Sequence, residues 1–276
     1  FVVSGPALLA AAMRTVGGRP GEVLAAGIFC VALWWASYLN WYVTAGMVSY
    51  VWSAFLATYI GAAIWRQCSR PTGLRAVVGL ALACALAWWI HPHFPLLVLL
   101  FVAPLIFSNY PHLKKSRLLI VAGVVSIVAI LGNLPWLLAM LEGNQINGGN
   151  LLGSYRFQRE VAPTRFLREA IGLFGKNATG SKIYPLLLIA TFFAAKWASG
   201  HRRRLIFACL GGWLAAQLFA YLGGLVEWIA AIEPNRIAPI GYLLLVFPAV
   251  WGCSAIWGGL HATDSKIKWH SRMAGV

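Results

Sequence analysis

Long apolar runs that alternate with short polar connections constrain the fold of this chain more than any other feature. Residues 205–226 and 237–260 form two such runs, and each is about as long as the ~20-residue helix that crosses a bilayer. Of the 276 residues, 60% are hydrophobic and only 11% are charged. A soluble domain carries roughly a quarter charged residues. The sequence therefore predicts an all-α fold, a polytopic bundle of transmembrane helices.

The apolar runs recur along the whole chain and predict about nine membrane segments. Together they form a single transmembrane domain over residues 1–276, with one long polar loop at residues 142–182. Because Phe1 lies inside an apolar run, we expect an N-terminal part of the domain to precede it. The expected segments cover residues 1–13, 23–38, 47–65, 74–90, 94–107, 118–141, 183–197, 205–226 and 237–260.

The basic residues divide the connections into two alternating sets. Of the 22 Lys and Arg residues, seven lie in one set, and six of those seven fall in the 142–182 loop, where the charge rule has little weight. The positive-inside rule therefore places the other set, and the C-terminus, on the cytoplasmic side. That set comprises Arg14, Arg19, Arg66, Arg70, Arg75, Lys114, Lys115, Arg117, Lys196, Arg202, Arg203, Arg204, Lys266, Lys268 and Arg272.

This topology also explains the formal net charge of +15. A nucleic-acid partner is not expected, because no soluble domain offers a platform of basic and aromatic residues. The Arg202–Arg204 run can instead contact anionic lipid headgroups. We expect an integral protein of the bacterial inner membrane, surrounded by membrane lipids.

A small polar island separates the last two apolar runs. It contains Glu233, Pro234 and Arg236, and Pro234 is suited to the first turn of the helix that follows. The helix N-terminus and the Arg236 guanidinium both favour a phosphate-sized anion, and Glu233 can orient the arginine. The alternative is an interfacial Glu–Arg pair that only anchors the helix end.

Two histidines mark another corner on the predicted outer face. His91 and His93 flank Pro92 at the end of the 74–90 run, and at a turn both can reach one cavity. Interfacial histidines without a ligand are the alternative interpretation. No metal site is expected, because further ligands lie only at a distance in the sequence. The five cysteines are scattered without a ligand spacing, so no cofactor is indicated.

The 142–182 loop supplies the remaining candidates. Arg156 and Arg159 are basic residues that can contact a substrate, and Arg165 and Arg168 belong to an expected amphipathic helix on the outer surface. The alternative is a solvated face that covers the bundle. Residues 143–153 are rich in Gly and Asn and predict a mobile segment.

Several short motifs give the chain a family resemblance. They are Trp41–Met47, His91-Pro92, Leu134-Pro135-Trp136 and Glu233-Pro-Asn-Arg236, set among alternating apolar runs. Together they resemble the multi-pass glycosyltransferases of the GT-C superfamily and their uncharacterised bacterial relatives. The resemblance implies a polyprenyl-phosphate-linked sugar as donor, used on the extracytoplasmic side. It also implies a catalytic carboxylate in the first outer loop, which we expect upstream of Phe1.

The resulting hypothesis is a membrane glycosyltransferase-like protein of the cell envelope. It would transfer a sugar from a polyprenyl-phosphate carrier to an outer-face acceptor, and its activity is left open. By the resemblance, Arg236 meets the donor phosphate and His91 lines the same cavity. The alternative hypothesis is a non-catalytic scaffold subunit with membrane protein partners, or a lipid or polysaccharide transporter.

Overall fold

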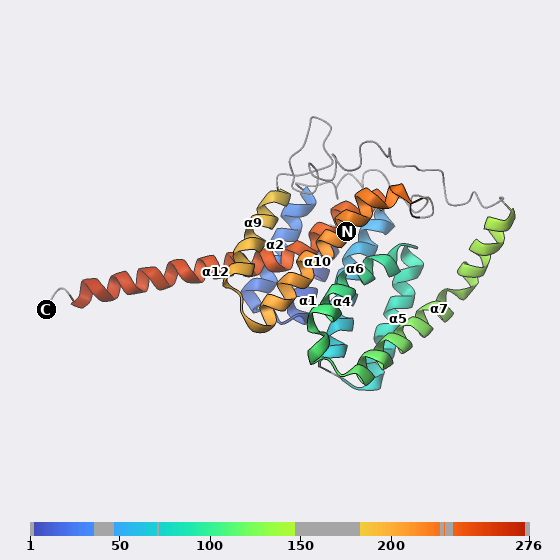
Figure 1. Ribbon diagram of the computed structural model, residues 1–276, viewed down its shortest axis with the longest axis horizontal. Helices are drawn as coiled ribbons and strands as arrows, with labels where there is room; N and C mark the ends of the chain where they lie inside the picture. Colours follow the sequence, from blue (N-terminus) through green and yellow to red (C-terminus); the bar gives the residue numbers. More distant parts are fainter. Residues whose placement is uncertain are drawn as a thin grey trace, which may run out of the picture.

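The computed structural model is helical throughout the residues that it describes, which are 3–35, 47–70, 72–146, 183–226, 229 and 234–273. None of these residues lies in a strand. Three short 3₁₀ segments occur beside the α-helices, η1 (Tyr110–His112), η2 (Gly223–Leu225) and η3 (Pro234–Ile237). The α-helices (Figure 1) are α1 (Ser4–Thr15), α2 (Pro20–Trp35), α4 (Val48–Ser69), α5 (Leu74–Ile90), α6 (Phe94–Asn109), α7 (Lys115–Ile146), α9 (Ile183–Trp197), α10 (Gly200–Leu222) and α12 (Ala238–Met273).

Within these ranges, five helical segments are long and apolar enough to cross a membrane. Three further apolar helices are shorter, namely Pro20–Trp34, Leu74–Ile90 and Ile183–Trp197. The predicted all-α fold with several transmembrane-type helices is thus confirmed, whereas the number of nine crossings stays a prediction. The five long segments are Val48–Ser69, Phe94–His112, Lys115–Glu142, Gly200–Leu222 and Ile240–Trp257.

Most helices extend beyond the apolar runs that predict them. The runs 74–90 and 183–197 coincide with α5 and α9, but α10 begins at Gly200 rather than at residue 205. Helix α7 continues to Ile146, four residues beyond the predicted start of the loop, and α12 continues to Met273 rather than residue 260. Hydropathy marks the stretch that suits lipid, whereas backbone hydrogen bonding propagates a helix into polar residues. The expected amphipathic helix lies outside the described residues.

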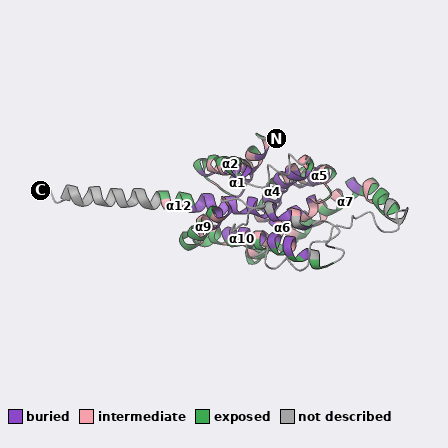
Figure 2. Cartoon of the chain, turned by 90° about the horizontal axis from the view of Figure 1, so that it is seen from above, coloured by how far each residue is buried: buried purple, intermediate pink, exposed green. Residues whose placement is uncertain are grey.

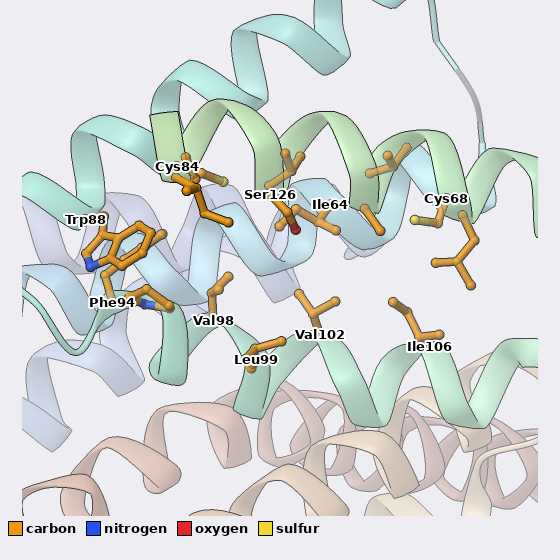
Figure 3. Close-up of a pocket in the computed structure, with 17 residues that line it drawn as sticks. Ile64, Cys68, Cys84, Trp88, Phe94, Val98, Leu99, Val102, Ile106 and Ser126 are labelled. Atoms are coloured by element: carbon orange, nitrogen blue, oxygen red, sulfur yellow. The ribbon is translucent and has the colours of Figure 1, made fainter. Parts of the chain in front are cut away.

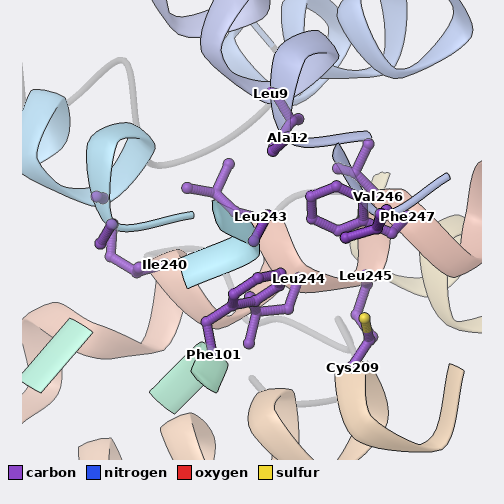
Figure 4. Packing of buried hydrophobic residues seen from close by; sticks show 14 of the residues in the cluster. Leu9, Ala12, Phe101, Cys209, Ile240, Leu243, Leu244, Leu245, Val246 and Phe247 are labelled. Carbon is purple, nitrogen blue, oxygen red and sulfur yellow. The ribbon is translucent and has the colours of Figure 1, made fainter. Parts of the chain in front are cut away.

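Helix α12 forms the centre of the bundle and contacts α9, α10, α2 and α4. In its Ile240–Trp257 segment 72% of the residues are buried, whereas only 11% are buried in an apolar 18-residue stretch of Lys115–Glu142 on α7. Figure 4 shows α12 residues Leu243 and Phe247 packed between Leu9 and Phe101 from other helices. Helix α7 therefore lies at the periphery (Figure 2), where its apolar side chains can face lipid.

Glycine allows two of these helix pairs to approach closely. A Cβ atom on Gly252 of α12 would overlap the backbone carbonyl of Ala190 on α9, and one on Gly61 of α4 would overlap the Phe101 ring of α6. Small residues at such crossings let helix backbones pack tightly in a membrane. A buried amide joins another helix pair at the periphery: Asn133 Nδ2 on α7 donates a hydrogen bond of 3.2 Å to the Ala85 carbonyl on α5.

Candidate functional site

The two histidines lie at the turn between α5 and α6. Helix α5 ends at Ile90, and His91 adopts an extended backbone with φ −155° and ψ 133°, as expected for a residue before proline. The backbone N–H of His93 donates to His91 Nδ1 at 3.1 Å. This bond turns the two rings toward each other, with centroids 5.0 Å apart. The two side chains therefore lie next to each other at the turn, whereas a cavity that both of them line stays a prediction.

Tyr50, near the start of α4, joins this corner to a distant part of the chain. Its ring meets His91 and His93 edge-on, with centroid distances of 5.0 and 5.9 Å. Its hydroxyl donates a hydrogen bond of 2.7 Å to the backbone carbonyl of Arg236. We call these four residues the histidine–arginine cluster. It joins α4, the α5–α6 turn and η3, which are far apart in sequence.

The segment that carries Arg236 is fixed by two other helices. The 3₁₀ turn Pro234–Ile237 leads directly into α12, so a helical turn does start at Pro234. Gln217 of α10 is fully buried, and its Nε2 donates to the Ala238 carbonyl at 2.7 Å. Together with the Tyr50 bond to the Arg236 carbonyl, this contact holds the backbone in place. The half-buried Arg236 side chain thus projects from a rigid support.

The histidine–arginine cluster combines one positively charged side chain, that of Arg236, with two uncharged imidazole rings. Burial, and to a smaller extent the nearby His93 and Arg236, together lower the pKa of His91 to about 4. Burial and then the Arg236 charge also lower the pKa of His93. Both imidazoles are therefore uncharged at neutral pH, while Arg236 is cationic. Because His91 Nδ1 accepts a hydrogen bond, its neutral form carries the proton on Nε2.

An apolar cavity of about 350 Å³ lies beside the histidine corner, between α4, α5, α6 and α7 (Figure 3). Trp88 and Phe94, which flank the two histidines in sequence, line one end of it, and Cys68 and Ile106 line the other. Along α6, the distance from Phe94 to Ile106 is about 18 Å at 1.5 Å per residue. A slender apolar chain, such as several carbons of a lipid tail, fits these dimensions.

The structure brings together three of the predicted site residues, Arg236, His91 and His93. Their role in substrate binding stays a prediction. The other three candidates, Glu233, Arg156 and Arg159, lie outside the described residues.

Tyr50 and Gln217 were missed by the sequence interpretation. Gln217 carries a visible signal, because it is a lone amide inside an apolar run. Tyr50 gives a weaker one, since aromatic residues are common at helix ends in membrane proteins.

Two further observations bear on the identity of the site. Across the described part of the chain, no three His, Cys, Asp or Glu side chains are grouped so that they could hold a metal ion. In comparisons with protein-family models, curated proteins and solved structures, nothing matches this chain.

Proposed function

We propose that the chain is a membrane glycosyltransferase-like protein that binds a polyprenyl-phosphate-linked sugar at the histidine–arginine cluster. One observation carries the proposal: a guanidinium and two uncharged imidazoles gather beside an apolar cavity. A polyprenyl phosphate has the same division, with a charged head on an apolar chain. The donor phosphate would meet Arg236, and the first isoprene units would enter the cavity between α6 and α7.

The residues of the cluster suit the departure of a phosphate. In the proposed reaction, an acceptor hydroxyl oxygen bonds to the anomeric carbon, and the bond from that carbon to the phosphate oxygen breaks. The electron pair leaves with the polyprenyl phosphate, and the hydroxyl proton goes to a base. Arg236 would stabilise the charge that grows on the phosphate. The neutral imidazole of His91 would donate a hydrogen bond from Nε2 to the phosphate. A second positive charge would therefore not be needed before the sugar–phosphate bond breaks.

The base in this scheme is a carboxylate, by the family resemblance. The structure describes the carboxylate side chains of Glu22 and Glu142. Glu22 is paired with Arg202, at 3.1 Å, and Glu142 is exposed on α7. We propose that the catalytic carboxylate acts on the outer, extracytoplasmic side, as the resemblance implies.

A non-catalytic scaffold subunit is the second candidate, and α7 favours it. Only 11% of the residues are buried in an apolar 18-residue stretch of Lys115–Glu142, and the side chains of Leu131 and Leu138 are 62% and 51% exposed. Such a surface suits lipid, but it also suits the helix of a membrane protein partner. In this case the chain would bind the carrier or hold a complex together without breaking the sugar–phosphate bond.

A glycosyltransferase releases free polyprenyl phosphate from the loaded carrier, whereas a scaffold subunit does not. The full-length protein in lipid nanodiscs is incubated with a radiolabelled polyprenyl-phosphate sugar and an acceptor that carries free hydroxyl groups, and the free carrier is separated from the loaded one. The glycosyltransferase proposal predicts release that Arg236→Gln reduces by about tenfold or more. Arg75→Gln, an exposed charge at the opposite ends of the helices, is the matched control. Binding without release would favour the scaffold, and unchanged release by Arg236→Gln would exclude Arg236 from the mechanism.

A further inference from the structure

A second cavity, of about 590 Å³, lies at the opposite ends of the helices from the histidine–arginine cluster. Helix α4 passes the cluster at Tyr50 and reaches this cavity with Arg66, about 24 Å further along at 1.5 Å per residue, and Arg70 follows the end of the helix. Arg14 at the end of α1, and Arg202 and Arg204 at the start of α10, complete its charged wall. We call it the basic cavity.

The charge of the basic cavity is mostly uncompensated by the described side chains. Of its five arginines, Arg202 pairs with the buried carboxylate of Glu22, at 3.1 Å. Arg204 Nε donates to Asn109 Oδ1 at 3.1 Å, and Asn109 is itself 3% exposed. An amide fixes the position of a guanidinium but supplies no negative charge. Like charges held together in a partly buried hollow repel one another, so an anion there is favourable.

The arginines of the basic cavity lie at helix ends of opposite polarity. Arg14 and Arg66 lie in the last turns of α1 and α4, where the helix dipole favours a cation. Arg202 lies in the first turn of α10 and Arg204 directly after it, near a helix end where the dipole opposes a cation and Ser199 makes no side-chain cap. An anion bound at this helix end would offset both the dipole and the two guanidinium charges.

The positive-inside rule does not explain this convergence by itself. It accounts for basic residues on one side of the membrane, but it does not require that they share a hollow. Arg203 and Arg75 belong to the same predicted side and do not line the basic cavity. The lining arginines come from three helices, and two of them are held by the buried residues Glu22 and Asn109. Fixed, convergent guanidinium groups are suited to the oxygens of a phosphate.

We propose that the basic cavity binds a phosphate-bearing anion on the face opposite the histidine–arginine cluster. The anion is either the headgroup of an anionic phospholipid or a soluble phosphorylated molecule, and both present the same oxygens to the arginines. The volume leaves room for a phosphate and the group attached to it. The stacked rings of Trp65 and His201, with centroids 5.3 Å apart, form an aromatic wall beside the charges.

The test compares two pairs of substitutions in the full-length protein. Arg66→Gln with Arg204→Gln removes two charges from the basic cavity, and Arg75→Gln with Arg203→Gln removes two charges from the same face outside it. Phosphatidylglycerol retention is measured by native mass spectrometry from nanodiscs that also contain phosphatidylcholine. Pyrophosphate binding is measured by calorimetry in phosphatidylcholine nanodiscs. Arg14→Gln with Arg66→Gln replaces the first pair if loss of the Asn109 contact prevents folding.

Each outcome decides the proposal. Selective retention of phosphatidylglycerol that falls about tenfold or more only in the lining variant supports a lipid headgroup. Pyrophosphate binding with the same dependence supports a soluble phosphate ligand. Equal loss in the lining and control variants would mean a diffuse surface charge and would overturn the proposal. The absence of both kinds of binding in the wild-type protein would overturn it as well.

Discussion

The hydroxyl of Tyr50 donates a hydrogen bond of 2.7 Å to the backbone carbonyl of Arg236, a residue 186 positions away in the sequence. The Tyr50 ring also contacts both His91 and His93. One buried side chain thus connects the two parts of the chain that the sequence singles out as a candidate site. The position of Arg236 relative to the histidines depends on this residue.

Removal of the Tyr50 hydroxyl should lower the stability of the protein while the ring contacts of the histidine–arginine cluster remain. Tyr50→Phe keeps the ring contacts but leaves the Arg236 carbonyl without this donor, which should cost about 1 kcal/mol of stability. Thermal unfolding in detergent measures this loss. Tyr59→Phe, on the same helix but 36% exposed, is the control and should unfold like the wild-type protein. An unchanged unfolding temperature for Tyr50→Phe would contradict the structural role of the hydrogen bond.

The histidines predict a stability that depends on pH. The pKa of His91 is about 4 in the folded protein, against 6.5 for an exposed histidine. Between these values the unfolded chain binds more protons than the folded one, so stability is complete above pH 6.5 and falls as the pH drops toward 4. His91→Gln should flatten this part of the unfolding profile. A profile that is the same in wild type and variant would show that His91 does not have a lowered pKa.

A bound phosphate should reverse this shift. A negative charge near the imidazole favours its protonated form, so the pKa of His91 should rise when farnesyl phosphate binds. The histidine side-chain signals in ¹⁵N NMR report the titration directly. Farnesol, which has the same apolar chain without the charge, should leave the pKa of His91 unchanged. If both compounds have the same effect, the phosphate does not lie at the cluster.

The close approach of α9 and α12 predicts a contrast between two glycines. Gly252→Ala places a Cβ against the Ala190 carbonyl, whereas Gly123→Ala meets nothing within 4 Å. The first substitution should cost about 1–3 kcal/mol through overpacking, and the second should be neutral or slightly stabilising. Unfolding temperatures of the two variants in detergent measure the difference. Equal temperatures would mean that α9 and α12 do not pack at Gly252.

Hydropathy predicts the helical fold well because lipid-facing and core-facing residues are both apolar in a membrane protein. It predicts the ends of α7 and α12 poorly, since a helix continues through polar residues once it has formed. The cluster was only partly predictable. His91, His93 and Arg236 are visible as polar residues at run ends, but Tyr50 and Gln217 act through long-range contacts that periodicity does not record.

The basic cavity was not predicted, although its five arginines all belong to the basic set of connections. The alternation of charge indicates on which side Arg14, Arg66 and Arg204 lie. It does not indicate which of them converge, because convergence depends on how the helices cross. The buried partners Glu22 and Asn109 are equally hidden, since a single acid or amide near a run end has many possible neighbours.

If Arg236 and His91 bind one phosphate together, their contributions to its affinity are coupled, and a double-mutant cycle measures this coupling. The affinity for farnesyl phosphate is measured for the wild type, Arg236→Gln, His91→Gln and the double variant, with Arg75→Gln as the charge control. We predict that each single change weakens binding, by about tenfold or more for Arg236→Gln. The double variant should lose less than the product of the two effects. Wild-type affinity in Arg236→Gln, or strictly multiplicative losses in the double variant, would contradict a shared site.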